Sequence, residues 1–158
     1  MNPFAARIYA FALLPVAVAG GLFFLFREDD RKNENLAVSD EPTVEVGGRI
    51  FSVEIADDPV SRSKGLSDRD ELPEDRAMLF LFESPGRPGF WMKGMRFPID
   101  IAWIRDGYIV HIARRVPADY PGTIHPDYVS DSVFETNAGA LDSADVGSEV
   151  IFRGVGLD

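Results

Sequence analysis

The N-terminal part of the sequence contains an uncharged, strongly apolar stretch of 19 residues, from Ile8 to Phe26. As a helix it would be about 28 Å long at about 1.5 Å per residue, close to the ~30 Å hydrocarbon core of a bilayer. Pro15 and the Gly20-Gly21 pair would weaken a helix in water, but they are tolerated within membranes. We therefore expect a membrane anchor over residues 1–27, with a transmembrane helix at about 8–26.

A cleaved signal peptide is the alternative, because Ala17-Val18-Ala19 fits the small-x-small pattern of a cleavage site. Cleavage there would leave an exposed apolar tail, so an uncleaved signal anchor is favoured. The basic residues leave the orientation open: Arg7 precedes the stretch, and Arg27, Arg31 and Lys32 follow it. That count alone would place the C-terminal part in the cytoplasm, whereas a short N-terminal tail more often stays inside.

The chain from Arg27 onward carries 15 basic and 26 acidic side chains, a net charge of −11. A domain this acidic is a poor candidate for nucleic acid and would be repelled by anionic lipid. The sequence contains no cysteine, which excludes disulfides, thiolate metal sites and a cysteine nucleophile.

Residues 28–41 are polar and charged without an apolar period, as is typical of a flexible tether. The rest of the chain, residues 42–158, contains two hairpin signals. Thr43 to Ala56 forms two alternating runs around Gly47-Gly48, and Ile99 to Ile104 leads through Asp106-Gly107 into Tyr108 to Val116. Further strands are expected at 78–82, 90–92, 132–136 and 149–155.

Helical signals in residues 42–158 are few. Asp57-Asp58-Pro59 predicts the start of a short helix over 60–66, and 138–146 is a second, weaker candidate. The sequence thus predicts a mainly β domain of about seven or eight short strands with one or two short helices. A compact barrel-like sheet or a sandwich fits this pattern best.

Four motifs follow one another in a fixed order: R-S-K-G-L-S-D-R, M-L-F-L-F, F-W-M-K-G-M-R-F-P-I-D-I-A-W-I and E-T-N-A-G…V-G-S-E-V. This order resembles the DUF192 family (also UPF0127) over Thr43 to Phe152. Ser67 replaces the usual methionine, Gly94-Met95 replaces Asn-Thr, and Ser148-Glu149 replaces Gly-Asp. The resemblance implies a small, mostly β domain, commonly found behind a signal peptide or membrane anchor in prokaryotes, and no particular activity. It favours an extracytoplasmic position for the domain.

The third motif supplies the main candidate site. Alternation would place Trp91, Lys93 and Met95 on one face, and a bend at Phe97-Pro98 could bring Asp100 back towards Lys93. Trp91, Lys93 and Asp100 would then form the rim of a ligand pocket. The alternative is a Lys–Asp pair that fixes a bend, with the tryptophan and methionines as core filler. Trp103 is expected in the core.

Arg62 is the next ligand-binding candidate, because a guanidinium can clamp a carboxylate or phosphate. Alternatively it anchors the short helix by bonding nearby carbonyls, with Gly65 supplying a positive φ at the helix end. Among acidic residues, Asp100 and Glu135 are the pair of interest for acid–base chemistry, because both lie on predicted strands; a solvated acidic surface is the alternative.

Metal and cofactor sites are not expected. The two histidines, His111 and His125, lack the spacing of a zinc site, and the methionines lie in apolar segments as packing residues do. No nucleophile elbow, P-loop or dinucleotide motif occurs, so we expect no recognised catalytic class.

Three functional hypotheses follow. The leading one is a membrane-tethered, extracytoplasmic accessory domain that binds a small molecule, a glycan or an envelope protein. The second is a hydrolase or lyase of an envelope polymer that uses Asp100 as acid or base, tuned by Lys93. The third is a structural partner in a membrane complex.

Overall fold

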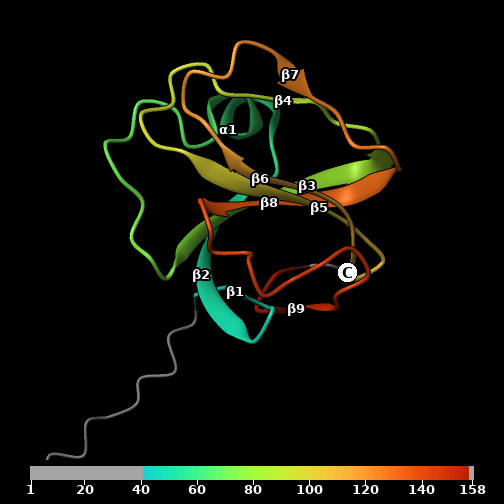
Figure 1. Cartoon of the computed structure of the whole chain (residues 1–158). Coiled ribbons are helices and arrows are strands. Elements are labelled where there is room, and N and C mark those ends of the chain that lie inside the picture. The colour runs from blue at the N-terminus through green and yellow to red at the C-terminus, as the bar shows by residue number, and fades with distance from the viewer. Residues whose placement is uncertain (1–40, 157–158) are drawn as a thin grey trace, which may run out of the picture. The chain divides into compact units, whose positions relative to one another are not determined.

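A computed structural model describes residues 41–156 (Figure 1). Among these residues, no helix is both long and apolar enough to cross a membrane. The anchor expected at 8–26 and most of the tether expected at 28–41 lie outside the described residues. The described elements are β1 (Thr43–Val46), β2 (Arg49–Ala56), α1 (Pro59–Lys64), β3 (Arg76–Gly86), β4 (Phe90–Trp91), β5 (Ile99–Arg105), β6 (Tyr108–Val116), β7 (Thr123–Ile124), β8 (Ser130–Asn137) and β9 (Val150–Arg153).

Seven strands form one sheet in the order β6-β5-β8-β3-β2-β1-β9. All neighbours are antiparallel except β2 and β3, which are parallel and are connected by the segment that contains α1. The sheet curls into a half-barrel, with β1, β2 and β9 facing the layer of β3, β5, β6 and β8 (Figure 1). The start of β6 and the turn before it bond the start of β9 and the segment before it: Val150 N–H donates to Gly107 O at 2.8 Å, and Ile109 N–H donates to Ser148 O at 3.0 Å. These bonds bring the two edges of the sheet together.

The sheet buries apolar side chains on both of its faces. Inside the curl, Phe51, Ala102 and Phe134 belong to one core cluster, and on the other face Phe80, Ile101 and Trp103 belong to a second. The second cluster is covered by α1 and by β4, which pairs with β7 in a small separate ribbon (Figure 1). Because side chains alternate along a strand, β5 sends even-numbered residues into the curl and odd-numbered residues towards α1.

Both predicted hairpins are present. Gly47 and Gly48 have φ values of 58° and 77°, and Asp106 and Gly107 have φ values of 50° and 78°. Positive φ at both central residues is the condition for a type I′ turn, whose twist matches that of paired strands. The mainly β fold class and the helix near 60–66 are therefore confirmed, and the barrel alternative is realised as a half-barrel.

The helix expected at 138–146 is wrong. Gly139 has a φ of 85°, and the segment forms successive turns in which Ala140 N–H bonds Asn137 O at 3.0 Å and Ala144 N–H bonds Leu141 O at 3.0 Å. The N–H groups of Gly139 and Leu141 donate to the carboxylate of Asp100 instead of to helix carbonyls. A buried side-chain acceptor thus replaces the helical bonds that the sequence pattern favoured.

Candidate functional site

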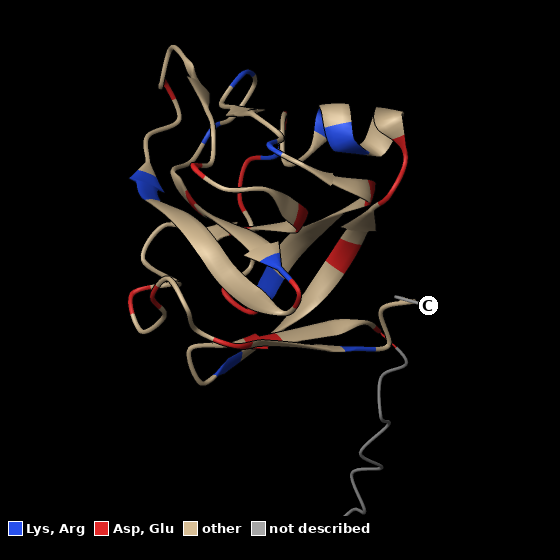
Figure 2. Ribbon diagram, turned by 90° about the vertical axis from the view of Figure 1, so that its right-hand side faces the viewer, with Lys and Arg blue, Asp and Glu red and all other residues tan. Residues whose placement is uncertain are grey.

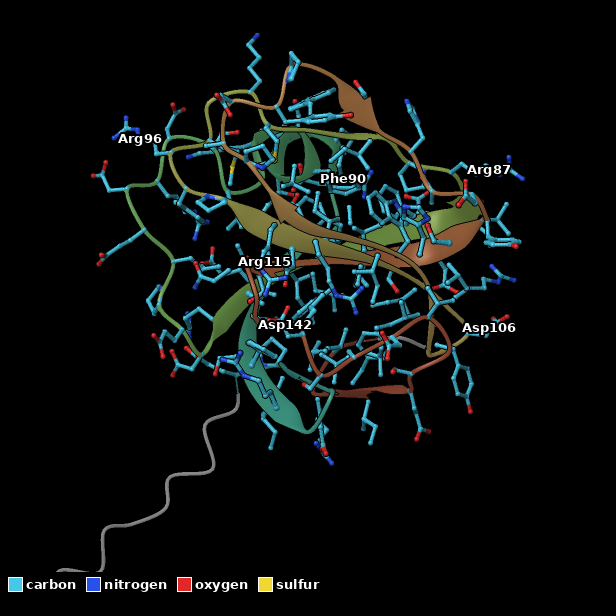
Figure 3. The ribbon with its side chains drawn as sticks, viewed as in Figure 1. Arg87, Phe90, Arg96, Asp106, Arg115 and Asp142 are labelled. Atoms are coloured by element: carbon cyan, nitrogen blue, oxygen red, sulfur yellow. The ribbon has the colours of Figure 1, made fainter. Side chains whose placement is uncertain are left out.

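A cavity of about 200 Å³ lies on the face of the sheet that α1 and β4 cover. Phe80 of β3 and Glu135 of β8 come from the sheet and form its floor. Residues 62–67, at the end of α1 and just after it, form one wall, and residues 88–91, together with Phe82 and Met95, complete the lining. Phe90 lies between β4 and the sheet (Figure 3). The lining therefore combines four aromatic side chains with a few polar and charged ones, a mixture that is typical of small-ligand sites.

Hydrogen bonds made by Asp58 and Arg62 hold the wall that α1 forms in place. Asp58 caps the helix by accepting bonds from Val60 N–H at 2.7 Å and Ser61 N–H at 3.1 Å. Arg62 Nη1 donates to Asp57 O at 2.5 Å and to Leu81 O at 2.9 Å, which ties the helix to β3. These bonds hold a helix of six residues that would be unstable alone.

Gly65 ends α1 directly above the floor of the cavity. Its φ of 49° favours glycine, and an added Cβ would lie 3.4 Å from the ring of Phe80 and 3.7 Å from Oε2 of Glu135. The chain after Gly65 then docks on the next wall, where Ser67 Oγ donates to Lys93 O at 2.8 Å and Asp68 N–H donates to Gly94 O at 2.8 Å. The two walls are therefore connected to each other.

Glu135 is the unusual group in this cavity. It is only 4% exposed, and among residues 41–156 no hydrogen-bond donor or cationic side chain contacts its carboxyl group. Burial raises the pKa of Glu135 to about 8 from an ordinary value of 4.5, because the apolar surroundings disfavour the charged form. Near neutral pH the carboxyl group is therefore mostly protonated, and it can donate and accept a hydrogen bond.

The chain matches the DUF192 family model, described as "Uncharacterized ACR", over residues 42–152. The chain belongs to the DUF192 family. No curated protein matches it. A crystal structure from Sinorhizobium meliloti 1021, whose description proposes a transcription regulator, is 28% identical with a TM-score of 0.68, and the match covers 73% of this chain and 95% of that one. A protein of unknown function from Novosphingobium aromaticivorans DSM 12444 is 27% identical with a TM-score of 0.66, covering 70% and 83%.

The DUF192 domain brings only part of the predicted site to this cavity. Arg62 and Trp91 line it, and Trp91 is 50% exposed. Arg62 also anchors α1, as the alternative interpretation expects, and its role in ligand binding stays a prediction. Lys93 is exposed and lines a more open neighbouring hollow of about 420 Å³, which shares Trp91 and includes residues 118–122. Arg69, in the same R-S-K-G-L-S-D-R motif, pairs with Glu54 at 2.6 and 2.7 Å.

Asp100 lies on the opposite face of the sheet from the cavity. It is fully buried, and its carboxylate accepts bonds from Arg115 N–H at 2.7 Å, Gly139 N–H at 2.9 Å and Leu141 N–H at 3.0 Å. The predicted approach of Asp100 to Lys93 is therefore not observed, because the strand pleat turns Asp100 into the curl. Arg115 and Asp142, which form an ion pair, lie together on this side (Figure 3).

The DUF192 domain also separates the two carboxyl groups that were considered for acid–base chemistry. Asp100 pairs with Thr136, and Glu135 pairs with Ile101, so Asp100 and Glu135 are offset by one residue on adjacent strands. An offset of one residue places side chains on opposite faces. The sequence therefore indicates Glu135 only as one member of this pair. Its position in the cavity depends on the register of β8.

Gly89 provides a test of how tightly the β4 wall is packed. An added Cβ would lie 2.7 Å from Cγ2 of Thr123 and closer still to the ring of His125, so Gly89→Ala must displace these side chains or β7 itself. We expect a destabilisation of about 1–3 kcal/mol, as for other overpacked sites. The measurement is urea unfolding of the full chain.

The matched control for this prediction is Gly86→Ala, whose added Cβ meets nothing within 4 Å. We expect that variant to change stability by less than about 1 kcal/mol. Equal effects of the two variants would contradict the close approach of β4 and β7.

Proposed function

We propose that this DUF192 protein is a small-molecule-binding accessory protein of the cell envelope, with its ligand site in the Glu135 cavity. The observation that carries the proposal is a carboxyl group that is 4% exposed, lines a cavity together with four aromatic side chains, and forms no hydrogen bond or ion pair within residues 41–156. Buried polar groups in proteins are almost always hydrogen-bonded. A ligand that bonds this carboxyl group supplies the missing partner.

The location of the protein is part of the same proposal. The uncharged stretch at 8–26 has the length and composition of a single transmembrane helix, which would tether domain 42–158 to the bilayer. Family context supports an extracytoplasmic domain. The net charge of −11 from Arg27 onward supports a role without nucleic acid.

A hydrolase or lyase built on Asp100 and Lys93 receives no support. An acid or base must reach the proton it transfers, whereas Asp100 is fully buried and both of its oxygens bond backbone N–H groups. We therefore assign Asp100 a structural role in the sheet.

The test is a fragment screen of the full chain in a nonionic detergent, using small aromatic compounds and monosaccharides, read out by saturation-transfer NMR. We expect compounds that bind the wild type to lose at least about tenfold in affinity with Trp91→Ala, as is common for an aromatic anchor of a binding site. Trp91 is 50% exposed, so this change should leave the fold intact.

Tyr108→Ala is the matched control, because Tyr108 is 51% exposed and lies on β6, away from the lining of the cavity. It should bind the same compounds as the wild type does. The proposal fails if no compound binds, or if both aromatic variants bind as the wild type does. Monosaccharide binding that depends on Trp91 would identify the ligand as a glycan.

A further inference from the structure

The polar groups that line the Glu135 cavity are arranged by charge. Within residues 41–156, Glu135, on the sheet, is the only acidic residue of the lining, and the basic residues, Arg62 and Lys64, both come from α1. Figure 2 shows basic residues, in blue, on the short helix. The cavity thus presents a carboxyl group at its inner end and two cations on its outer wall.

The inner end suits a protonated amine. Phe80, Phe90 and Trp91 line the cavity, and aromatic faces attract ammonium groups, most strongly when both are removed from water. A carboxylate and an ammonium that meet in such surroundings form a charge-assisted hydrogen bond, which is about twice as strong as a neutral one. Glu135 lacks any such partner among residues 41–156.

The outer wall suits an anion. Arg62 uses Nη1 for two carbonyl groups and lies over the ring of Phe82 at 5.3 Å, so its position is fixed. Lys64 is exposed, and no acidic side chain within residues 41–156 pairs with it. A carboxylate or phosphate at the mouth of the cavity would be attracted by both groups.

Resting on the proposed function, we infer that the ligand is a small amphoteric molecule, such as an amino acid, whose ammonium group binds Glu135 and whose anionic group faces Arg62 and Lys64. The volume of about 200 Å³ limits the ligand to roughly this size. A ligand with only an ammonium group, or only an anionic group, would have a partner at one end of the cavity and none at the other.

Binding of the ammonium group requires Glu135 to ionise. The elements packed against its carboxyl group present Met78 and Phe80 from β3 and Ile101 from β5, all apolar, and the charged groups of the lining are those of α1. Because burial keeps the pKa of Glu135 at about 8 in the free protein, the group is mostly protonated at pH 7. Close to one proton should therefore be released to the buffer for each ligand bound.

The experiment uses four probes with the same ring: L-phenylalanine, phenethylamine, 3-phenylpropionate and 2-phenylethanol. Each is titrated into the full chain by calorimetry at pH 7, in two buffers with different ionisation enthalpies. We expect phenylalanine to bind at least about tenfold more tightly than the other three, with proton release for the two amines.

Two variants test which side chain of the protein binds each end of the ligand. Glu135→Gln should abolish the preference for amines together with the proton release, and Lys64→Gln should reduce the advantage of phenylalanine over phenethylamine. Equal binding of all four probes, weakened by Trp91→Ala, would overturn the amphoteric ligand and leave the cavity as a binding site. Binding of none of the probes, with no binder in the fragment screen, would overturn both proposals.

Discussion

The free energy of unfolding should fall by about 3.5 kcal/mol between pH 5 and pH 8 because of Glu135 alone, since each pH unit well between the folded and unfolded pKa values accounts for about 1.4 kcal/mol and the change levels off near both. Burial raises the pKa of this carboxyl group to about 8, whereas its ordinary value is 4.5. Between these values the folded state retains a proton that the unfolded state has lost. The contribution of Glu135 to stability is therefore fully present below pH 4.5 and is lost as the pH rises towards 8.

Glu135→Gln isolates this effect, because glutamine keeps the shape of the side chain and does not ionise. The variant should match the wild type below pH 4.5 and become increasingly more stable than it up to pH 8, as measured by urea unfolding with tryptophan fluorescence. Glu83→Gln is the control on the surface of the neighbouring strand, where the side chain is exposed. Parallel pH profiles of the wild type and Glu135→Gln would show that the carboxyl group has a counter-charge in the folded protein.

Asp100→Asn should destabilise the protein by about 3–5 kcal/mol, because it removes a buried charge that accepts three backbone N–H bonds. The amide has nearly the same volume, so no cavity forms. Its NH₂ group would face N–H donors, which leaves at least one of them unsatisfied. The measurement is urea unfolding at pH 7, with the midpoint and slope compared with those of the wild type.

Asp70→Asn is the matched control for Asp100→Asn. Asp70 forms an ion pair with Arg96 in which the carboxylate side chain is 84% exposed, and exposed pairs contribute about 0–1 kcal/mol. An Asp100→Asn variant as stable as Asp70→Asn would contradict a framework role. It would show that the turns at 138–146 hold together without the carboxylate.

Both hairpins, the short helix and the core position of Trp103 could be predicted, because each depends on a local pattern. Trp103 is fully buried, and its indole N–H donates to Pro88 O at 2.9 Å. The pairing of β2 with β3 and the insertion of β8 between β5 and β3 could not be predicted, because they join segments far apart in the sequence. The two-residue strand β7 was missed, since its partner β4 is equally short.

The candidate site was predictable only where it depends on the F-W-M-K motif and on Arg62. Trp91 alternates with buried Phe90 and Met92, and this local pattern places it at the cavity. The face on which Asp100 and Glu135 lie depends on the strand register, which a single sequence does not specify. Glu135 also stands in a segment of mixed polarity, where a buried carboxyl group leaves no periodic signal.

The position of β8 between β5 and β3 has a consequence for folding kinetics. The hairpins β1–β2 and β5–β6 involve neighbours in sequence and can form early, whereas β8 pairs on one side with β3, far back along the chain. Closing so long a loop is entropically costly, and a fold that depends on non-local pairing is slow, typically folding in milliseconds to seconds. β8 joins the β5–β6 hairpin to β3, and Glu135 is buried only when β8 has paired with both neighbours.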